Sequence, residues 1–140
     1  DWKLENTHQN RHHYLASREP EDQTKLIKAG ITDDFTMGYA DVSGFRLGTC
    51  RPVKWINPMT RQLTSLTLHP LSVMDCTLSE SQYMGLPLNE AFRYCLQLLK
   101  QTKQYGGEIV WLWHNTSFAE TEKNSYHKTL YVRLLNALIQ

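Results

Sequence analysis

The stretch Glu108-Ile109-Val110-Trp111-Leu112-Trp113-His114-Asn115 decides the fold class of this sequence. It follows the turn pair Gly106-Gly107 and holds five successive apolar residues, which predict a β-strand buried on both faces. An imidazole and an amide stand where the apolar run stops, and in α/β proteins ligands bind at the carboxyl ends of parallel strands. His114 is therefore the first candidate for chemistry. The alternative is a histidine that only caps the loop after the strand.

The composition fits one globular domain over residues 1–140, with 41% hydrophobic and 21% charged residues. A formal net charge of +1 argues against nucleic acid or an anionic membrane as the main partner. No apolar run is long enough to cross a membrane, and the first residues lack a signal-peptide pattern, so we expect a soluble protein and favour a cytoplasmic, bacterial location.

Residues 1–10 are polar and have no hydrophobic period, which predicts a poorly ordered start. Three widely spaced cysteines, Cys50, Cys76 and Cys95, predict reduced thiols buried as small hydrophobes.

Periodic segments predict strands that alternate with helices, and this alternation indicates an α/β fold. Helices are expected from Pro20 to Ala29, over residues 87–105 with a stop at Gly106, and over residues 124–138 with Tyr131, Leu134, Leu135 and Leu138 inward. Strands are expected within residues 31–39, over 53–56 and over 63–74, where Pro70 marks an edge strand or a bulge. Residues 40–52 are punctuated by glycine and predict a long loop.

Several polar residues fall at the predicted strand ends or in the loops after them. They are Arg11, His13, Tyr14, Asp33, Asp34, Arg46, Asp75, His114 and Asn115. A histidine beside a carboxylate, with an arginine that keeps a carboxylate ionised, suits acid–base hydrolysis. Each member also has a plainer interpretation: Arg11 could bridge a surface carboxylate, Asp33 could cap a turn, and Arg46 could donate hydrogen bonds to backbone carbonyls.

Other kinds of catalytic site are poorly supported. The sequence has no Gly-x-Ser-x-Gly elbow, and the run from Gly44 to Gly48 matches neither a phosphate loop nor a dinucleotide fingerprint. Among six histidines, only His8 and His12 have metal-ligand spacing, and His8 lies in an unpatterned segment. We therefore assign no metal ligand within this chain.

Five short motifs, in one order, resemble a known family. They are Arg11-x-His13-Tyr14-Leu15, Gly38-Tyr39-Ala40, Gly44-Phe45-Arg46-x-Gly48-Thr49, Val73-Met74-Asp75-x-Thr77-Leu78 and Leu112-Trp113-His114-Asn115. Together they are similar to the C-terminal half of bacterial polysaccharide deacetylase-like proteins of the NodB-homology superfamily (carbohydrate esterase family four). The resemblance covers the chain from about Arg11 to the C-terminal helix.

This resemblance implies part of a distorted (β/α) barrel and metal-dependent removal of N- or O-acetyl groups from a polysaccharide or sugar precursor. It makes His114 the acid that protonates the leaving group and Arg11 the arginine that orients a catalytic aspartate. His13, Tyr14, Asp34, Arg46, Asp75, Trp113 and Asn115 are then expected to support the site or bind substrate.

The family's aspartate pair and histidine metal motif belong to its N-terminal half, and this sequence has neither. The chain alone is therefore expected to be inactive, because metal hydrolysis needs the ion, zinc or a similar divalent cation, to generate its nucleophile. We expect its partner to be the N-terminal half of the barrel or a second copy of itself, since half a barrel exposes open strand edges. The alternatives are a carbohydrate-binding module that stacks sugars on Trp55, Trp111 or Trp113, and a module that only completes another subunit's barrel.

Overall fold

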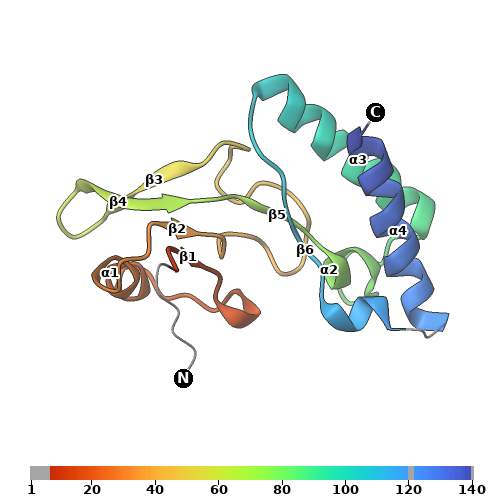
Figure 1. Ribbon diagram of the computed structural model, residues 1–140, viewed down its shortest axis with the longest axis horizontal. Helices are drawn as coiled ribbons and strands as arrows, with labels where there is room; N and C mark the ends of the chain where they lie inside the picture. The colour runs from red at the N-terminus through yellow and green to blue at the C-terminus, as the bar shows by residue number, and fades with distance from the viewer. Residues whose placement is uncertain (1–6, 120–121, 140) are drawn as a thin grey trace.

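The computed structural model of the chain describes residues 7–119 and 122–139. This part is a mixed α/β fold with two small sheets and four α-helices (Figure 1). The strands are β1 (Gln9–Asn10), β2 (Asp33–Asp34), β3 (Val53–Asn57), β4 (Gln62–Leu68), β5 (Leu71–Met74) and β6 (Val110–Leu112). The helices are α1 (Glu21–Lys28), α2 (Asp75–Ser79), α3 (Leu88–Tyr105) and α4 (Glu122–Ile139). The α/β class is confirmed, and the partial barrel stays a prediction.

The larger sheet lies at one end of the molecule, and α3 and α4 lie at the other (Figure 1). Its strand order is β1-β2-β4-β3, with the first three strands parallel and β3 antiparallel to β4. Trp55, Leu66 and Leu68 form its buried core, and Leu26 and Ile27 of α1 pack against them. The apolar residues of α1 therefore cover this sheet.

Two predictions for the N-terminal third need correction. Gln9–Asn10 pairs with β2 as β1, so this part of residues 1–10 is ordered, whereas residues 1–6 lie outside the described part of the chain. Within the expected strand over 31–39, only Asp33–Asp34 is a strand. The backbone turns soon afterwards, because the Gly38 N–H donates to the Thr36 carbonyl at 2.8 Å instead of to a neighbouring strand.

The predicted strand over residues 63–74 is two strands in two different sheets. β4 ends at Leu68 and β5 begins at Leu71, with His69 and Pro70 between them. Since proline has no N–H to donate, it interrupts a strand ladder. After Pro70 the chain pairs in parallel with β6 in the smaller sheet. Pro70 thus marks the passage from one sheet to the other.

The strand before His114 is less enclosed than its sequence predicts. All three residues of β6 are half-buried, and among the described residues this strand pairs with β5 alone. A two-stranded sheet leaves an open edge, so the apolar run is only partly covered.

The larger core lies between the smaller sheet and the helices α2, α3 and α4. Its buried members are Val73, Leu78, Ala91, Cys95, Leu98, Leu130 and Leu134. The predicted end of α3 is confirmed, because Gly106 closes the helix in the left-handed region with φ 61°.

The predicted inward stripe of α4 is wrong in part. Leu134 is buried, but Leu135 is 36% exposed and Leu138 is 50% exposed. His127 and Leu130 face the core instead, since residues seven and four positions before Leu134 lie on the same side of the helix.

The two sheets are joined at His69, the residue before the crossing proline. Its Nε2 lies 2.8 Å from an Asp33 carboxylate oxygen, and its Nδ1 lies 2.6 Å from a Glu108 carboxylate oxygen. The ring also stacks on Phe35 with centroids 4.2 Å apart. One imidazole therefore connects β2, the β4–β5 junction and the segment before β6.

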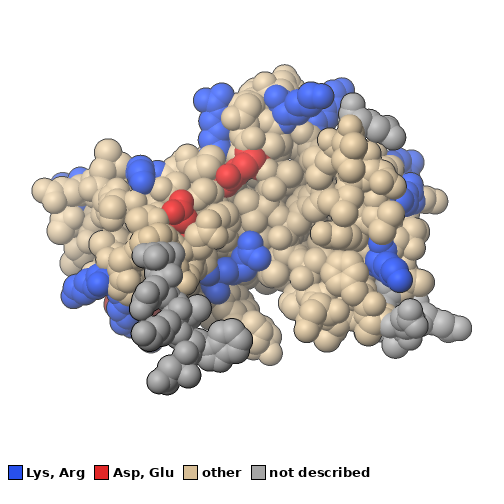
Figure 2. Space-filling model, in the orientation of Figure 1, with Lys and Arg blue, Asp and Glu red and all other residues tan. Residues whose placement is uncertain are grey.

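Three further sequence expectations concern thiols, membranes and charge. The cysteines Cys50, Cys76 and Cys95 are free, as predicted, but the predicted burial holds for Cys50 and Cys95 alone, because Cys76 is only partly buried. No described helix combines the length and hydropathy that crossing a bilayer requires. Lys and Arg side chains are scattered over the visible face instead of forming one patch (Figure 2).

Candidate acid–base site

The site is built where the parallel strands β5 and β6 end. Register pairs Met74 with Leu112, so Asp75 and His114 follow neighbouring strand ends. The His114 Nδ1 lies 2.7 Å from Oδ1 of Asp75, and the His114 backbone N–H donates to Oδ2 at 2.9 Å. Sequence alone offered several carboxylates for His114, and the structure selects Asp75.

The Asp75 carboxylate is fully buried and accepts four hydrogen bonds. Besides the two from His114, it accepts the Cys76 backbone N–H at 2.8 Å and a very short bond from the Ser117 hydroxyl. Burial alone would raise the pKa of Asp75, but the bonds from Ser117 and His114 together outweigh burial and hold the pKa below its ordinary value. The carboxylate is therefore ionised at neutral pH and fixes the His114 ring through Nδ1.

Ser117 is a residue of this site that the sequence did not predict. It lies in a 3-10 turn, Asn115–Phe118, and its N–H donates to the His114 carbonyl at 3.0 Å. A serine three residues after a strand-end histidine is a weak signal, because turns are rich in serine for many reasons. Its role became visible only once the turn placed its hydroxyl on Asp75.

Two adjoining hollows open beside His114, and Cys76, Glu80 and His114 line both. The first, here called the polar hollow, has a volume of about 490 Å³ and also reaches Thr116, Ser117 and His127. The second, here called the apolar hollow, has a volume of about 410 Å³ and also reaches Leu15, Met74, Tyr83 and Leu112. The side chain of His114 is 42% exposed, so its free ring edge is accessible from this region.

The N-terminal motif reaches the same place. Arg11, His13 and Tyr14 all line the apolar hollow together with His114. Tyr14 and Leu15 both have positive φ, 57° and 53°, a conformation that costs non-glycine residues about 1–2 kcal/mol each. A strained turn after β1 therefore presents this motif to the hollow.

Arg11 and Asp34 are electrostatic neighbours. Burial lowers the pKa of Arg11, and the negative charge of Asp34 partly offsets that effect. Asp34 is fully buried, and its Oδ1 accepts hydrogen bonds from Asn10 and Thr36, both at 2.7 Å. The Arg11 Nε donates to the Phe35 carbonyl at 3.3 Å. Within the described chain, the hydrogen bonds of Arg11 and Asp34 go to the end of the strand and not to His114.

Three other candidate residues serve local structure. The Arg46 guanidinium donates to the Gly38 carbonyl at 3.0 Å, which is the plainer of its two interpretations. Trp113 donates to the His127 carbonyl at 3.3 Å and packs against Tyr131. The Asn115 Oδ1 accepts the N–H of the next residue within its own turn.

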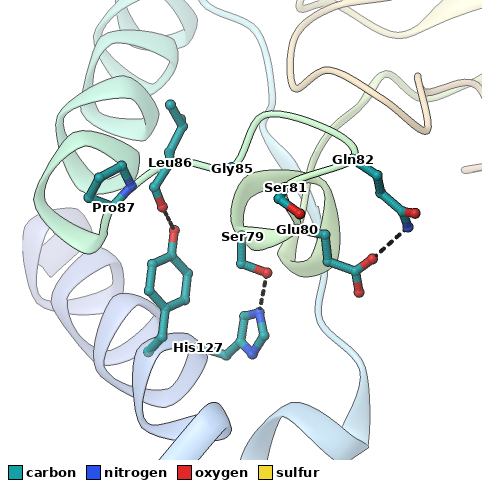
Figure 3. Close-up of a pocket in the computed structure, with 9 residues that line it drawn as sticks. Ser79, Glu80, Ser81, Gln82, Gly85, Leu86, Pro87 and His127 are labelled. Atoms are coloured by element: carbon teal, nitrogen blue, oxygen red, sulfur yellow. Dashed lines mark hydrogen bonds between the residues drawn. The ribbon is translucent and has the colours of Figure 1, made fainter.

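A third hollow, with a volume of about 660 Å³, adjoins the polar hollow and shares Glu80 and His127 with it. The Ser79 hydroxyl lies 2.8 Å from Nε2 of His127, and Gln82 donates to Glu80 at 2.8 Å (Figure 3). The contact between Ser79 and His127 joins the end of α2 to α4. This contact holds α2, the helix that begins with Asp75, against α4.

One set of side chains in residues 7–119 and 122–139 brings three donor groups within reach of a single metal ion: Asp75, Cys76 and His114. Both Asp75 oxygens already accept two hydrogen bonds each. The three donors are one carboxylate, one thiol and one imidazole, and they do not match the histidine metal motif that the family resemblance implies.

The Trp stacking faces required by the binding-module alternative are mostly covered. Trp55 is 3% exposed and its Nε1 donates to Glu19 at 2.6 Å. Trp111 and Trp113 are half-buried and pack against the larger core.

Comparisons of this chain with protein-family models, with curated proteins and with solved structures found no match.

Proposed function

We propose that this chain supplies the proton-donating side of a glycan deacetylase. The observation that carries the proposal is the pair formed by His114 and Asp75. A half-exposed imidazole bonded through Nδ1 to a fully buried, ionised carboxylate is the arrangement of a general acid–base histidine. The motif order described for the sequence supports a glycan substrate.

Amide hydrolysis adds water across the acyl C–N bond. The acyl carbon takes the hydroxyl of the attacking water, the C–N bond breaks, and the departing nitrogen needs a proton. In this proposal Nε2 of His114 gives that proton, the group that activates the water takes the proton of the water, and exchange with solvent restores both groups. Asp75 keeps the Nδ1–H directed toward itself, so that Nε2 is the nitrogen that meets the substrate.

The groups that activate the water belong, in this proposal, to a partner segment that completes the barrel. A divalent metal is expected there. The chain alone should therefore bind acetylated sugar without hydrolysing it at an appreciable rate.

The binding test follows the His114 imidazole by NMR while an N-acetylglucosamine oligomer is added to the chain. We expect the His114 ring signals to shift and those of exposed His8 to stay unchanged. Absence of any shift at millimolar sugar would argue against a glycan site.

The activity test uses the native protein together with the segment that completes its barrel. We expect His114→Gln to lower deacetylation by roughly 10²–10⁴-fold, the usual contribution of general acid–base catalysis, and to remove one limb of the pH profile. His8→Gln, a histidine on the exposed surface, is the matched control. Unchanged turnover in His114→Gln would refute the proposed role.

A further inference from the structure

The side chain of His114 stands between two hollows whose walls differ in chemistry. On one side, Thr116, Ser117 and His127 place polar side chains in the wall, where the Ser117 hydroxyl bonds to Asp75 and His127 Nε2 lies 2.8 Å from the Ser79 hydroxyl. On the other side, Leu15, Met74 and Leu112 present aliphatic or thioether groups. A ligand that touches both hollows must therefore have a hydroxyl-rich part and an apolar part, joined beside the histidine.

Two charged side chains, Arg11 and Glu80, also line the apolar hollow, and each already has a partner. The Arg11 Nε is bonded to the Phe35 carbonyl, and its guanidinium carbon lies 5.9 Å from the centre of the Phe35 ring. The Glu80 carboxylate accepts a hydrogen bond from Gln82 at 2.8 Å. Both charged side chains thus have partners already, which leaves the aliphatic wall to determine what the hollow accepts.

An N-acylated sugar has the required two-part structure. Its scissile bond joins a ring that carries hydroxyl groups to an acyl chain, and the proposed acid must reach that bond. With Nε2 of His114 at the boundary, the sugar lies in the polar hollow and the acyl chain enters the apolar hollow.

The size of the apolar hollow exceeds what an acetyl group needs. A methyl group occupies roughly the volume of one water molecule, about 30 Å³. The hollow measures about 410 Å³ and is bounded in part by the ring of Tyr83. We propose that the site accepts N-acyl groups longer than acetyl, with several further methylene carbons in the apolar hollow. This inference rests on the proposed deacylation at His114 and names its acyl substrate.

The test compares binding of N-acetyl-, N-propionyl- and N-butyrylglucosamine to the chain by calorimetry or by His114 NMR shifts. Burying one methylene should tighten binding about fourfold, so butyryl should bind roughly sixteenfold more tightly than acetyl. In the variant Ala40→Leu, a larger side chain in the wall of the apolar hollow should remove this gain while acetyl binding persists. The matched control, Ala119→Leu, enlarges a side chain of the polar hollow and should keep the gain with chain length.

The outcomes separate the two proposals. Acetyl binding without a gain for propionyl or butyryl would overturn the inference and leave the proposed function standing. No binding of any N-acyl sugar would overturn both. Alkyl glucosides, which lack an N-acyl group, provide a further comparison. If their affinity rose equally with chain length, and Ala40→Leu removed this rise, the hollow would bind an aglycone and the acyl assignment would be overturned. If Ala40→Leu fails to fold by circular dichroism, Tyr83→Ala replaces it, and loss of the aromatic wall should reduce the gain per methylene.

Discussion

Replacing Asp75 by asparagine should destabilise the fold as well as the candidate acid. Oδ1 accepts the bonds from His114 Nδ1 and from the Cys76 N–H, and Oδ2 accepts those from the His114 N–H and from Ser117. The amide of Asp75→Asn keeps one acceptor oxygen, so two donors lose their partner whichever way it is oriented. Hydrogen bonds to a charged group contribute about 1.5–3 kcal/mol each, which gives a loss of about 3–6 kcal/mol.

The loss should depend on pH in a defined direction. The pKa of Asp75 is held below its ordinary value in the folded chain, so its stabilisation is fully present above the unfolded pKa, about 4. It is lost as the pH falls through the lower, folded pKa. The pKa of Asp33 is also lowered, by hydrogen bonds from Thr32 and His69, but Asp33 is present in both proteins and cancels in their difference.

The assay is urea unfolding followed by circular dichroism at several pH values between 7 and 3. The gap between wild type and Asp75→Asn should be largest above about pH 5 and should shrink below about pH 4. The exposed residue Asp41 provides the matched control, Asp41→Asn, which should unfold within about 0.5 kcal/mol of wild type. A variant as stable as this control at pH 7, or a gap that does not change with pH, would refute the reasoning.

Three further predictions concern the joint between the sheets, a tight glycine and the thiols. His69→Gln should lower the free energy of unfolding by about 2–4 kcal/mol, because it leaves Asp33 and Glu108 without their shared imidazole partner. Urea unfolding beside His8→Gln checks this, and equal effects of the two changes would contradict it. Gly38→Ala should destabilise by about 1–3 kcal/mol, since an added Cβ would lie 2.9 Å from Leu71 atoms, and an unchanged melting temperature would disprove the contact. Burial raises the pKa of the Cys95 thiol to about 12, and burial with nearby charges raises the pKa of the Cys76 thiol to about 11. Iodoacetamide at pH 8, followed by mass spectrometry, should therefore label both thiols in urea and neither in the native chain. Rapid labelling of the native chain would count against this prediction.

Local sequence patterns were sufficient to predict several features of the fold. The end of α3 at Gly106 was predictable because a left-handed helix end favours glycine whatever surrounds it. The polar tip at His114 was predictable because an apolar run stops there. The inward face of α4 was not predictable from the sequence. Its 3.6-residue period admits two overlapping apolar stripes, and only contact with α3 selects the stripe through Leu130 and Leu134.

The sequence by itself determined that an α/β chain carries a histidine at the end of a strand, because strand and helix periods are properties of neighbouring residues. Only the tertiary structure decided which carboxylate holds that histidine, since Asp75 lies 39 residues earlier and reaches it through the register of β5 and β6. The crossing at Pro70 and the turn that brings in Ser117 were likewise decided by packing. Both place backbone or hydroxyl groups against partners that are distant in sequence, and no local pattern encodes such pairings.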